Sequence, residues 1–380
     1  MKLALVLDRF DRDRGGLEKW AWQWTKWLLD RGHAVHVVAA SGRDDFGSTR
    51  FRLSEVGFAR SRVAMAEKVA RHLETLNVDL VHDLGVGWRY DVIQPQFGTR
   101  LADNDRSLRA LGAPLGLIAR MSKKRRLADI RALETRQYVG NSGRVVAVSA
   151  MTRDDLIHWH DLPADRITVI HNGVDAYSFP PPDPERRRQL RQDAGLDGQI
   201  VLLFAAHNFA LKGLGTVLHA LKRVDRREFH LMVAGRGKRD HYSRLAGRLG
   251  IADQVTFTGF VPDIRDSYAV ADAFVQPTFY DPCSLAILEA AASGVAVVTS
   301  RFNGASELFR DGQSASVVAD PEDEVEVARH IGALVDPDHR ARLAAGGIAV
   351  ARQATAERSF AKLFDLCSET AGQRASRCRA

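Results

Sequence analysis

Asp281-Pro-Cys-Ser-Leu-Ala-Ile-Leu-Glu289 is followed by residues 290–294 and by the apolar run Val295-Ala-Val-Val298. This order predicts a turn, a helix that begins within Pro282-Cys-Ser-Leu, and then a buried strand. The first turn of a helix has backbone N–H groups without partners inside the helix, and it carries the positive end of the helix dipole. We therefore expect the backbone at Ser284 and Leu285 to suit a diphosphate.

Two acidic residues flank this predicted helix start. Glu289 is expected about two turns into the helix, where its carboxylate can accept hydrogen bonds from two ribose hydroxyls. Asp281 is expected just outside the helix, where it can accept from hydroxyls of a transferred sugar. The alternative is an ordinary helix cap beside an exposed acidic residue. Taken together, the order of these groups is typical of a sugar-nucleotide site.

Strand-like and helix-like segments alternate on both sides of the motif, which favours parallel sheets covered by helices. In the first half, we expect strands at residues 2–8, 34–39, 79–83, 145–149 and 167–170, with a first helix at 17–31. In the second half, we expect strands at residues 200–204, 230–234, 255–258, 273–276 and 295–299. This pattern predicts an α/β fold of two doubly wound, Rossmann-like parallel-sheet domains that face each other across a cleft.

A proline run marks the boundary between the two predicted domains. Residues 176–184 contain Pro180-Pro-Pro and separate the two series of strands, as expected of a linker. We place the first domain at residues 1–175 and the second at residues 176–355. Ligands in doubly wound domains lie beyond the carboxyl ends of the strands, so the loops there hold the candidate site residues.

Gly15 and Gly16 stand between the first predicted strand and the first predicted helix. Two glycines at this place let the backbone approach a bulky ligand and present N–H groups to a phosphate. A simple turn is the alternative. The spacing of a dinucleotide fingerprint is missing, which disfavours a nicotinamide cofactor.

The loop after the first strand of the second half contains His207, Asn208, Lys212 and Gly213. A lysine that enters a helix beside a glycine can neutralise phosphate charge. His207 and Asn208 are candidates to hydrogen-bond the same phosphates. The alternatives are a solvated lysine at a helix start and a capping role for Asn208.

Gly259 and Phe260 follow another predicted strand of the second half. The backbone at this pair is a candidate to read the edge of a nucleobase, with the Phe260 ring packed against the base. A core aromatic residue is the alternative interpretation of Phe260.

Residues 115–136 mix apolar side chains with a run of basic ones, among them Lys123, Lys124, Arg125 and Arg126. An amphipathic helix that lies on an anionic membrane surface fits this mixture. A solvated helix face fits equally well. Nucleic-acid binding is disfavoured because no aromatic residues are interleaved with the basic run.

The composition is that of a globular protein with an excess of positive charge. The chain has 380 residues, a net charge of +7, 45% hydrophobic residues and three cysteines. We expect no membrane-spanning segment, no signal peptide, no disulfide framework and no metal site, and therefore a cytoplasmic location. The positive charge favours anionic partners such as nucleotides or acidic lipids.

With these motifs assembled, the chain resembles the family-four retaining glycosyltransferases, which have the GT-B fold, and in particular the lipopolysaccharide core glucosyltransferases. The shared features are the glycine pair at 15–16, Arg31-Gly-His, the 171–175 element, Lys212-Gly, Ala234-Gly, Gly259-Phe and the 281–294 motif. The resemblance implies that Gly16, Lys212, Ser284 and Leu285 hold the diphosphate. It also implies that Glu289 holds the ribose, that Asp281 holds the sugar, and that a last helix at about 356–372 crosses back to the first domain.

Three positions depart from the family pattern. Asp281 stands where the family usually has the longer glutamate. His207 and Asn208 stand where it usually has an arginine. Many members have a histidine after the fourth strand, whereas residues 94–98 read Gln-Pro-Gln-Phe-Gly, so Gln96 is the candidate there.

The resemblance implies an enzyme that moves a hexose, glucose in the first place, from a UDP-sugar to an acceptor sugar on a glycolipid such as lipopolysaccharide core. Asp281, Lys212 and Gln96 are the candidate catalytic residues. No metal or other cofactor is expected, and the enzyme is expected in the cytoplasm, on the inner face of the plasma membrane. A sugar-nucleotide epimerase of the same fold and an inactive sugar-nucleotide-binding protein are the alternatives.

Overall fold

The structure, a computed structural model, describes residues 1–112, 116 and 124–377. Its contacts divide the chain into two compact units. The first unit groups Met1–Asn104, Ile118–His171 and Arg358–Ala380, and the second groups Asp105–Leu117 and Asn172–Glu357. The sequence placed the boundaries at residues 175 and 355 and did not indicate that residues 105–117 are grouped with the second unit.

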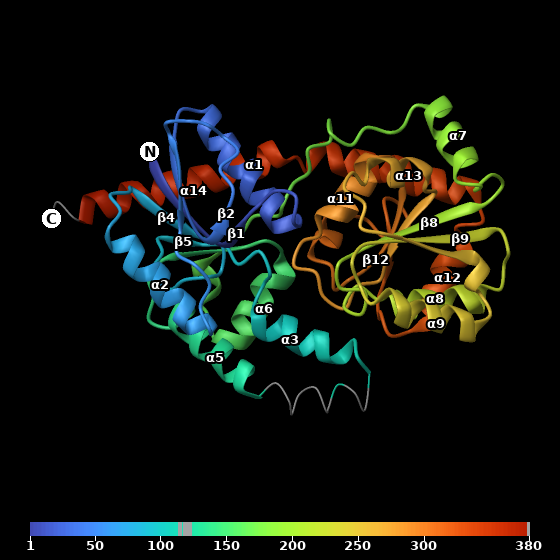
Figure 1. Cartoon of the computed structure of the whole chain (residues 1–380), viewed down its shortest axis with the longest axis horizontal. Helices are drawn as coiled ribbons and strands as arrows, with labels where there is room; N and C mark the ends of the chain where they lie inside the picture. Colours follow the sequence, from blue (N-terminus) through green and yellow to red (C-terminus); the bar gives the residue numbers. More distant parts are fainter. Residues whose placement is uncertain (113–115, 117–123, 378–380) are drawn as a thin grey trace. The chain divides into compact units, whose positions relative to one another are not determined.

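The first unit is an α/β domain with parallel strands (Figure 1). Its elements are β1 (Lys2–Phe10), α1 (Gly16–Asp30), β2 (Ala34–Gly42), β3 (Phe51–Glu55), α2 (Arg62–Glu74), β4 (Leu80–Asp83), β5 (Val92–Ile93), α3 (Arg100–Arg109), α5 (Lys124–Tyr138), β6 (Arg144–Ala147), α6 (Ala150–His160), β7 (Ile167–Val169) and α14 (Ala356–Arg377). Of these, α3 continues past residue 104 into the second unit, and α14 joins the first unit from Arg358 onward.

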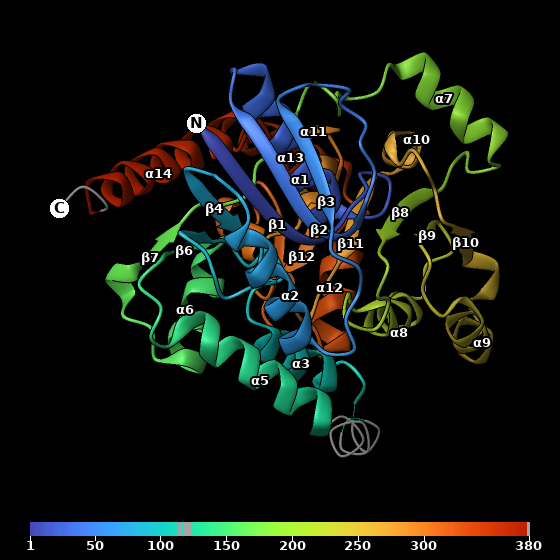
Figure 2. The same ribbon diagram turned by 60° about the vertical axis from the view of Figure 1, so that its left-hand side comes forward.

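The sheet of the first unit has the strand order β3-β2-β1-β4-β5-β6-β7. In Figure 2, β1, β2 and β3 lie side by side. The order reverses between β1 and β4, which pair in parallel with Leu3 opposite Leu80. Such a reversal leaves a crevice beyond the carboxyl ends of the two strands, where doubly wound domains bind ligands.

An aromatic cluster fixes α1 and α14 in the first unit. The sequence places Trp20, Trp24 and Trp27 on one face of the first helix, and all three are buried in the structure. Their rings surround the ring of Phe360 on α14, at centroid distances of 5.6, 5.4 and 6.3 Å. Trp22 points elsewhere, as the helical period predicts, and stacks on Phe46 at 5.2 Å.

The second unit repeats the architecture with six parallel strands. Its elements are α7 (Pro184–Asp193), β8 (Ile200–Ala205), α8 (Leu214–Val224), β9 (Phe229–Ala234), α9 (Arg239–Leu249), β10 (Val255–Gly259), α10 (Arg265–Val270), β11 (Ala273–Gln276), α11 (Leu285–Ala292), β12 (Ala296–Ser300), β13 (Ser316–Val318), α12 (Glu324–Ala333) and α13 (Pro337–Gln353).

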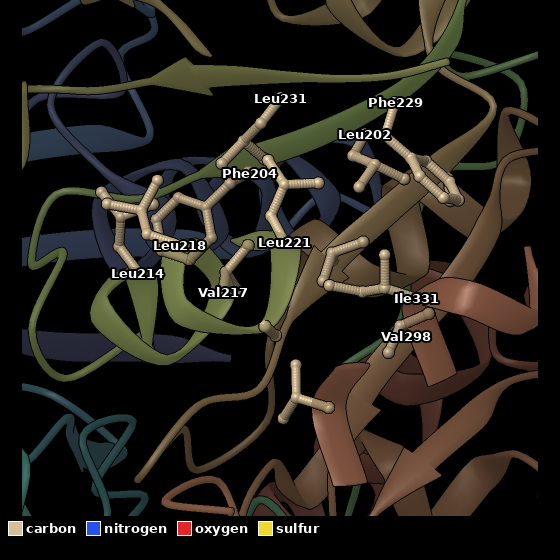
Figure 3. Close-up of a cluster of buried hydrophobic side chains, with 14 of the residues drawn as sticks. Leu202, Phe204, Leu214, Val217, Leu218, Leu221, Phe229, Leu231, Val298 and Ile331 are labelled. Atoms are coloured by element: carbon tan, nitrogen blue, oxygen red, sulfur yellow. The ribbon is translucent and has the colours of Figure 1, made fainter. Parts of the chain in front are cut away.

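The strand order in this unit is β10-β9-β8-β11-β12-β13, so the reversal falls between β8 and β11. The core is built from side chains of the central strands and of the covering helices. Figure 3 shows Leu202 and Phe204 of β8 beside Leu218 and Leu221 of α8, all of them fully buried. Burial of this apolar surface anchors the loops that leave the carboxyl ends of the strands.

The predicted α/β fold of two Rossmann-like domains is confirmed, and every predicted strand is present, with each end within three residues of the prediction. The sequence missed β3, β5 and β13. In the described part of the chain, no helix has both the length and the apolar character needed to cross a membrane.

Candidate active site

Lys212 and Asp281 form an ion pair at the strand-order reversal of the second unit. Lys212 lies in the loop after β8, and Asp281 lies in the loop after the neighbouring strand β11. The Lys212 Nζ is 2.6 Å from Asp281 Oδ2 and also donates to the carbonyl oxygen of Tyr280 at 3.1 Å. The two side chains are only 18% and 16% exposed, so water screens the pair weakly. The pair therefore presents a fixed cation and a fixed carboxylate where ligands of this fold bind.

The loop before α8 is held by its own hydrogen bonds. Asn208 Oδ1 accepts from the Leu211 backbone N–H at 3.2 Å and so closes a turn within the loop, whereas the cap residue of α8 is Gly213. Gly213 has a φ of +83°, and a Cβ atom there would lie 2.2 Å from the carbonyl oxygen of Pro277. A larger residue at position 213 is therefore excluded, and the turn fixes the direction in which Lys212 leaves the backbone. His207 and Asn208 are exposed beside it.

The start of α11 is tied to the loop after β12 through one buried amide. Ser284 is the cap residue, and its side chain makes no capping hydrogen bond. Its backbone N–H donates to Asn303 Oδ1 at 3.2 Å, and the same oxygen accepts from the Ala305 N–H at 3.2 Å. Asn303 is fully buried. The helix begins at Leu285, within the predicted stretch, and the backbone of its first turn remains a candidate for holding phosphate.

Glu289 is closer to the helix start than the sequence suggested. It is the fifth residue of α11, which puts it little more than one turn from the N-terminus rather than two, because Pro282, Cys283 and Ser284 stay in the preceding turn. The Tyr268 hydroxyl lies within hydrogen-bond distance of two acceptors, Glu289 Oε2 at 3.3 Å and the carbonyl oxygen of Ala286 at 3.2 Å. Burial beside this carboxylate raises the pKa of the Tyr268 phenol well above its usual value, so the phenol keeps the proton that it donates.

Phe260 lies at the surface of the second unit and is 37% exposed, so it is not the core residue of the alternative interpretation. The Arg236 guanidinium lies 4.0 Å from the ring centroid, and the His207 ring stacks at 6.4 Å. Gly259, with a φ of +74°, accepts from the Gly235 N–H at 2.7 Å. The predicted base-reading pair thus forms an exposed platform of aromatic and cationic groups, which suits a flat ligand.

The glycine pair of the first unit begins α1. Gly15 is the cap residue, in extended conformation, and Gly16 is the first residue of the helix. Glu18 of the first turn is half-buried, and this burial raises the pKa of its carboxyl group even though its own backbone N–H donates to it. An acid thus already occupies part of the helix start, and the phosphate role of Gly15 and Gly16 stays a prediction.

Gln96 is half-buried in a turn after β5. Two other polar residues of this region are internal: His82 is fully buried next to Trp20 and Trp24, and the carboxylate of Asp83 accepts backbone hydrogen bonds from Gly85, Val86 and Gly87 at 2.6–2.8 Å. Burial lowers the pKa of His82 to about 3 and raises that of Asp83 to about 7. Asp83 therefore shapes the loop after β4, and the catalytic role of Gln96 stays a prediction.

The basic segment at 115–136 is described in part. Residues 115 and 117–123, including Lys123, lie outside the described residues. From Lys124 onward the chain is helical, and the basic side chains of Lys124, Arg125 and Arg126 are exposed. The apolar side chains of this helix, Ile130 and Leu133 among them, are buried in the first unit. In α5, then, the exposed positions are basic residues, two alanines and a threonine, and no large apolar side chain is exposed.

Neither Tyr268 nor Asn303 is among the candidate site residues of the sequence analysis. Tyr268 precedes β11 on α10 and has no neighbour in sequence that would mark it. Asn303 followed a predicted strand end, which is the one signal that could have identified it. Both act by positioning the candidate residues Glu289 and Ser284.

Two family models match the chain and together cover most of it. A model described as Glycosyltransferase Family 4 matches residues 14–177. A model described as Glycosyl transferases group 1 matches residues 198–336. The first range covers the first sheet apart from β1, and the second covers the second sheet and includes Lys212, Asp281 and Glu289.

Curated relatives and solved structures point to the same class. The D-inositol 3-phosphate glycosyltransferase of Frankia alni is 34% identical over 234 residues, which are 57% of this chain and 56% of that relative. WaaG, a glycosyltransferase involved in lipopolysaccharide biosynthesis, superposes with a TM-score of 0.80 at 21% identity over 96% of this chain and 99% of its own. Anabaena Alr3699/HepE in complex with UDP-glucose has a TM-score of 0.74 at 19% identity over 99% and 100%. The two structural likenesses show the GT-B fold.

Proposed function

Since this chain belongs to the glycosyltransferases, with a family 4 domain followed by a group 1 domain, we propose that it is a retaining hexosyltransferase. Its donor is a UDP-sugar, UDP-glucose in the first place. Its acceptor is a sugar on a glycolipid such as lipopolysaccharide core. WaaG, a structural neighbour involved in lipopolysaccharide biosynthesis, and HepE, which binds UDP-glucose, support this choice.

The observation that carries the proposal is the ion pair between Lys212 and Asp281 at the strand-order reversal. The Lys212 ammonium supplies positive charge for a departing diphosphate, and the backbone N–H groups at the start of α11 supply further donors. The Asp281 carboxylate accepts from hydroxyls of the transferred sugar. Glu289, held by the Tyr268 hydroxyl, accepts from the ribose hydroxyls.

The same residues define a mechanism without a protein nucleophile. As the bond between the sugar and the diphosphate breaks, charge develops on the leaving phosphate oxygens, and Lys212 and the helix donors stabilise it. The acceptor hydroxyl attacks the anomeric carbon on the face from which the diphosphate departs and passes its proton to a phosphate oxygen. Configuration is therefore retained, and these groups neutralise the diphosphate without a metal ion.

The melting temperature of the protein tests the donor site directly. We expect UDP and one UDP-sugar, at about a hundredfold excess over Kd, to stabilise the folded state by about 2.7 kcal/mol. For a unit of this size, this corresponds to a rise of roughly 5–10 °C. The shift should be the same with magnesium and with a chelator, and GDP should give a smaller one. Failure of every nucleotide to shift the transition would contradict a donor site in this protein.

Two outcomes would favour other functions. Donor binding without transfer to any sugar acceptor would indicate an inactive sugar-nucleotide-binding protein, and interconversion of the bound sugar would indicate an epimerase. A phosphorylated polyol is a second acceptor class, favoured by the relative from Frankia alni, which is named a D-inositol 3-phosphate glycosyltransferase. Transfer assays with both acceptor classes distinguish it from the glycolipid.

We further propose that the protein works on the inner face of the plasma membrane, attracted by the exposed start of α5. Each basic residue near an anionic membrane contributes about 1 kcal/mol, so replacing Lys124, Arg125 and Arg126 with glutamine should weaken binding about a hundredfold. Co-sedimentation with vesicles of phosphatidylglycerol and phosphatidylcholine measures this change.

The matched control replaces three exposed arginines of α9, Arg239, Arg244 and Arg248, with glutamine, which removes the same charge from another surface. This variant should bind the vesicles as the wild type does. If both triple variants lose binding equally, net charge rather than α5 carries the attraction, and equal binding by all three proteins would exclude the membrane role of α5.

A further inference from the structure

A cavity of about 200 Å³ lies in the second unit, beyond the carboxyl ends of β11, β12 and β13. Phe279 follows β11, Arg301 and Phe302 follow β12, and residues 320–322 follow β13. Arg106 and Arg109, in the segment of α3 that is grouped with this unit, complete the lining. The volume is several times that of a water molecule and below the roughly 300–1,000 Å³ of pockets for drug-sized ligands, so it suits one small polar group.

Two arginines of the cavity share one aromatic ring. The Arg106 guanidinium carbon lies 4.3 Å from the Phe302 ring centroid, and that of Arg301 lies 5.0 Å from it. Arg109 of the same lining is paired with Asp105 at 3.5 Å, whereas among the described residues no ion pair involves Arg106 or Arg301. Both cations contact the same ring and line the same cavity, so an anion that reaches both would be attracted by two positive charges. A guanidinium offers paired N–H donors that match the oxygens of a phosphate.

The cavity also has acidic residues, which interact with a different part of a ligand than the arginines do. The Asp320 carboxylate already accepts from the backbone N–H of Glu322 at 2.9 Å, and the Asp320 and Glu322 side chains are exposed at the rim. Carboxylates repel a phosphate but accept hydrogen bonds from sugar hydroxyls. A lining of arginines and rim carboxylates around an aromatic ring therefore matches a ligand that carries both hydroxyls and a phosphate.

One backbone hydrogen bond joins the lining of the cavity to the candidate donor site. The backbone N–H of Asp281 donates to the carbonyl oxygen of Phe302 at 2.9 Å, and Phe279 precedes Asp281 by two residues. A ligand against Phe302 therefore lies next to the residue that is expected to hold the transferred sugar. This is where a glycosyltransferase needs its acceptor.

We propose that this cavity binds the acceptor through an anionic group, so that the enzyme uses a phosphorylated sugar or a phosphorylated sugar residue of a larger molecule. Arg106 and Arg301 hold the phosphate, and the carboxylates at the rim accept hydrogen bonds from the sugar hydroxyls. The inference rests on the proposed transferase function. To that function it adds the chemical class of the acceptor and the residues that select this acceptor.

The test measures binding of glucose 6-phosphate, glucose and inorganic phosphate by isothermal titration, with the protein saturated with UDP so that the donor site is filled. We expect glucose 6-phosphate to bind and glucose not to bind. In the double variant Arg106→Gln/Arg301→Gln, the Kd for glucose 6-phosphate should rise by about tenfold or more, because charge-assisted hydrogen bonds are lost. The control variant Arg248→Gln, on the exposed surface of α9, should bind as the wild type does.

The UDP melting shift separates this proposal from the proposed function. An unchanged UDP shift in the double variant shows that the fold and the donor site are intact, so that weaker sugar-phosphate binding is assigned to the cavity. Equal binding by wild type and double variant, or no binding by the wild type, would overturn the proposal. Failure of UDP to bind either the wild type or the double variant would contradict the transferase function instead. In that case, the difference in glucose 6-phosphate binding between the two proteins would still decide whether the cavity binds a phosphorylated sugar.

Discussion

Replacing Lys212 with methionine is expected to lower kcat for sugar transfer by about 10²- to 10³-fold, the effect of removing one donor that stabilises transition-state charge. Methionine keeps most of the length of the side chain and removes its ammonium group. The loss should appear in kcat more than in KM for the donor, because charge on the diphosphate grows as the bond to the sugar breaks. Release of UDP from the UDP-sugar selected by the melting screen, in the presence of lipopolysaccharide core, measures both constants.

Lys222→Met is the matched control because Lys222 lies on the following helix, α8, with its side chain 50% exposed. This variant should keep wild-type kinetics. Lys212→Met also leaves the Asp281 carboxylate without its cation, so Lys212→Met/Asp281→Asn should recover lost stability while kcat stays low. Wild-type turnover in a folded Lys212→Met protein would show that Lys212 takes no part in the reaction.

Replacing Trp24 with alanine should reduce the free energy of unfolding of the first unit by about 3–5 kcal/mol. The side chain is fully buried, and its ring is 5.3–6.4 Å from those of Trp20, Trp27, His82 and Phe360. The cavity left behind would remove the contact between α1 and α14. Urea unfolding followed by circular dichroism measures the loss, and hydrogen exchange should show faster exchange in α14.

Trp22→Ala makes the same chemical change on the same helix, at a half-buried ring that stacks on Phe46. Its cost should be on the order of 1 kcal/mol, without faster exchange in α14. Equal losses in the two variants would mean that the ring cluster around Phe360 does not hold α14.

The fold was predictable where strands are continuous apolar runs. Leu3 to Leu7 and residues 295–299 are unmistakable in the sequence because both faces of a central parallel strand are buried. The missed strands lack this signal: β3 reads Phe-Arg-Leu-Ser-Glu, β5 has two residues, and β13 reads Ser-Val-Val. These three segments are strands because they pair with neighbouring strands in the sheets. Strand pairing depends on the tertiary fold, so the local residue pattern does not predict it.

The sequence predicts the individual residues of the candidate site better than it predicts which of them lie next to each other. Lys212 and Asp281 each follow a predicted strand, which marks both as candidates. Their ion pair depends on β8 lying beside β11, and the sequence does not contain that strand order. The contact between Arg106 and Phe302 joins residues almost two hundred positions apart, so no local pattern indicates it.

The position of α14 has a consequence for protein synthesis. The cluster of Trp20, Trp24 and Trp27 is completed by Phe360, so a nascent chain that has emerged up to His171 still exposes an aromatic surface. At about 5–20 residues per second, the ribosome needs roughly 10–40 s more to reach Arg358. Most of the second unit is translated in that interval. The aromatic core of the first unit can therefore be completed only after most of the second unit has been translated.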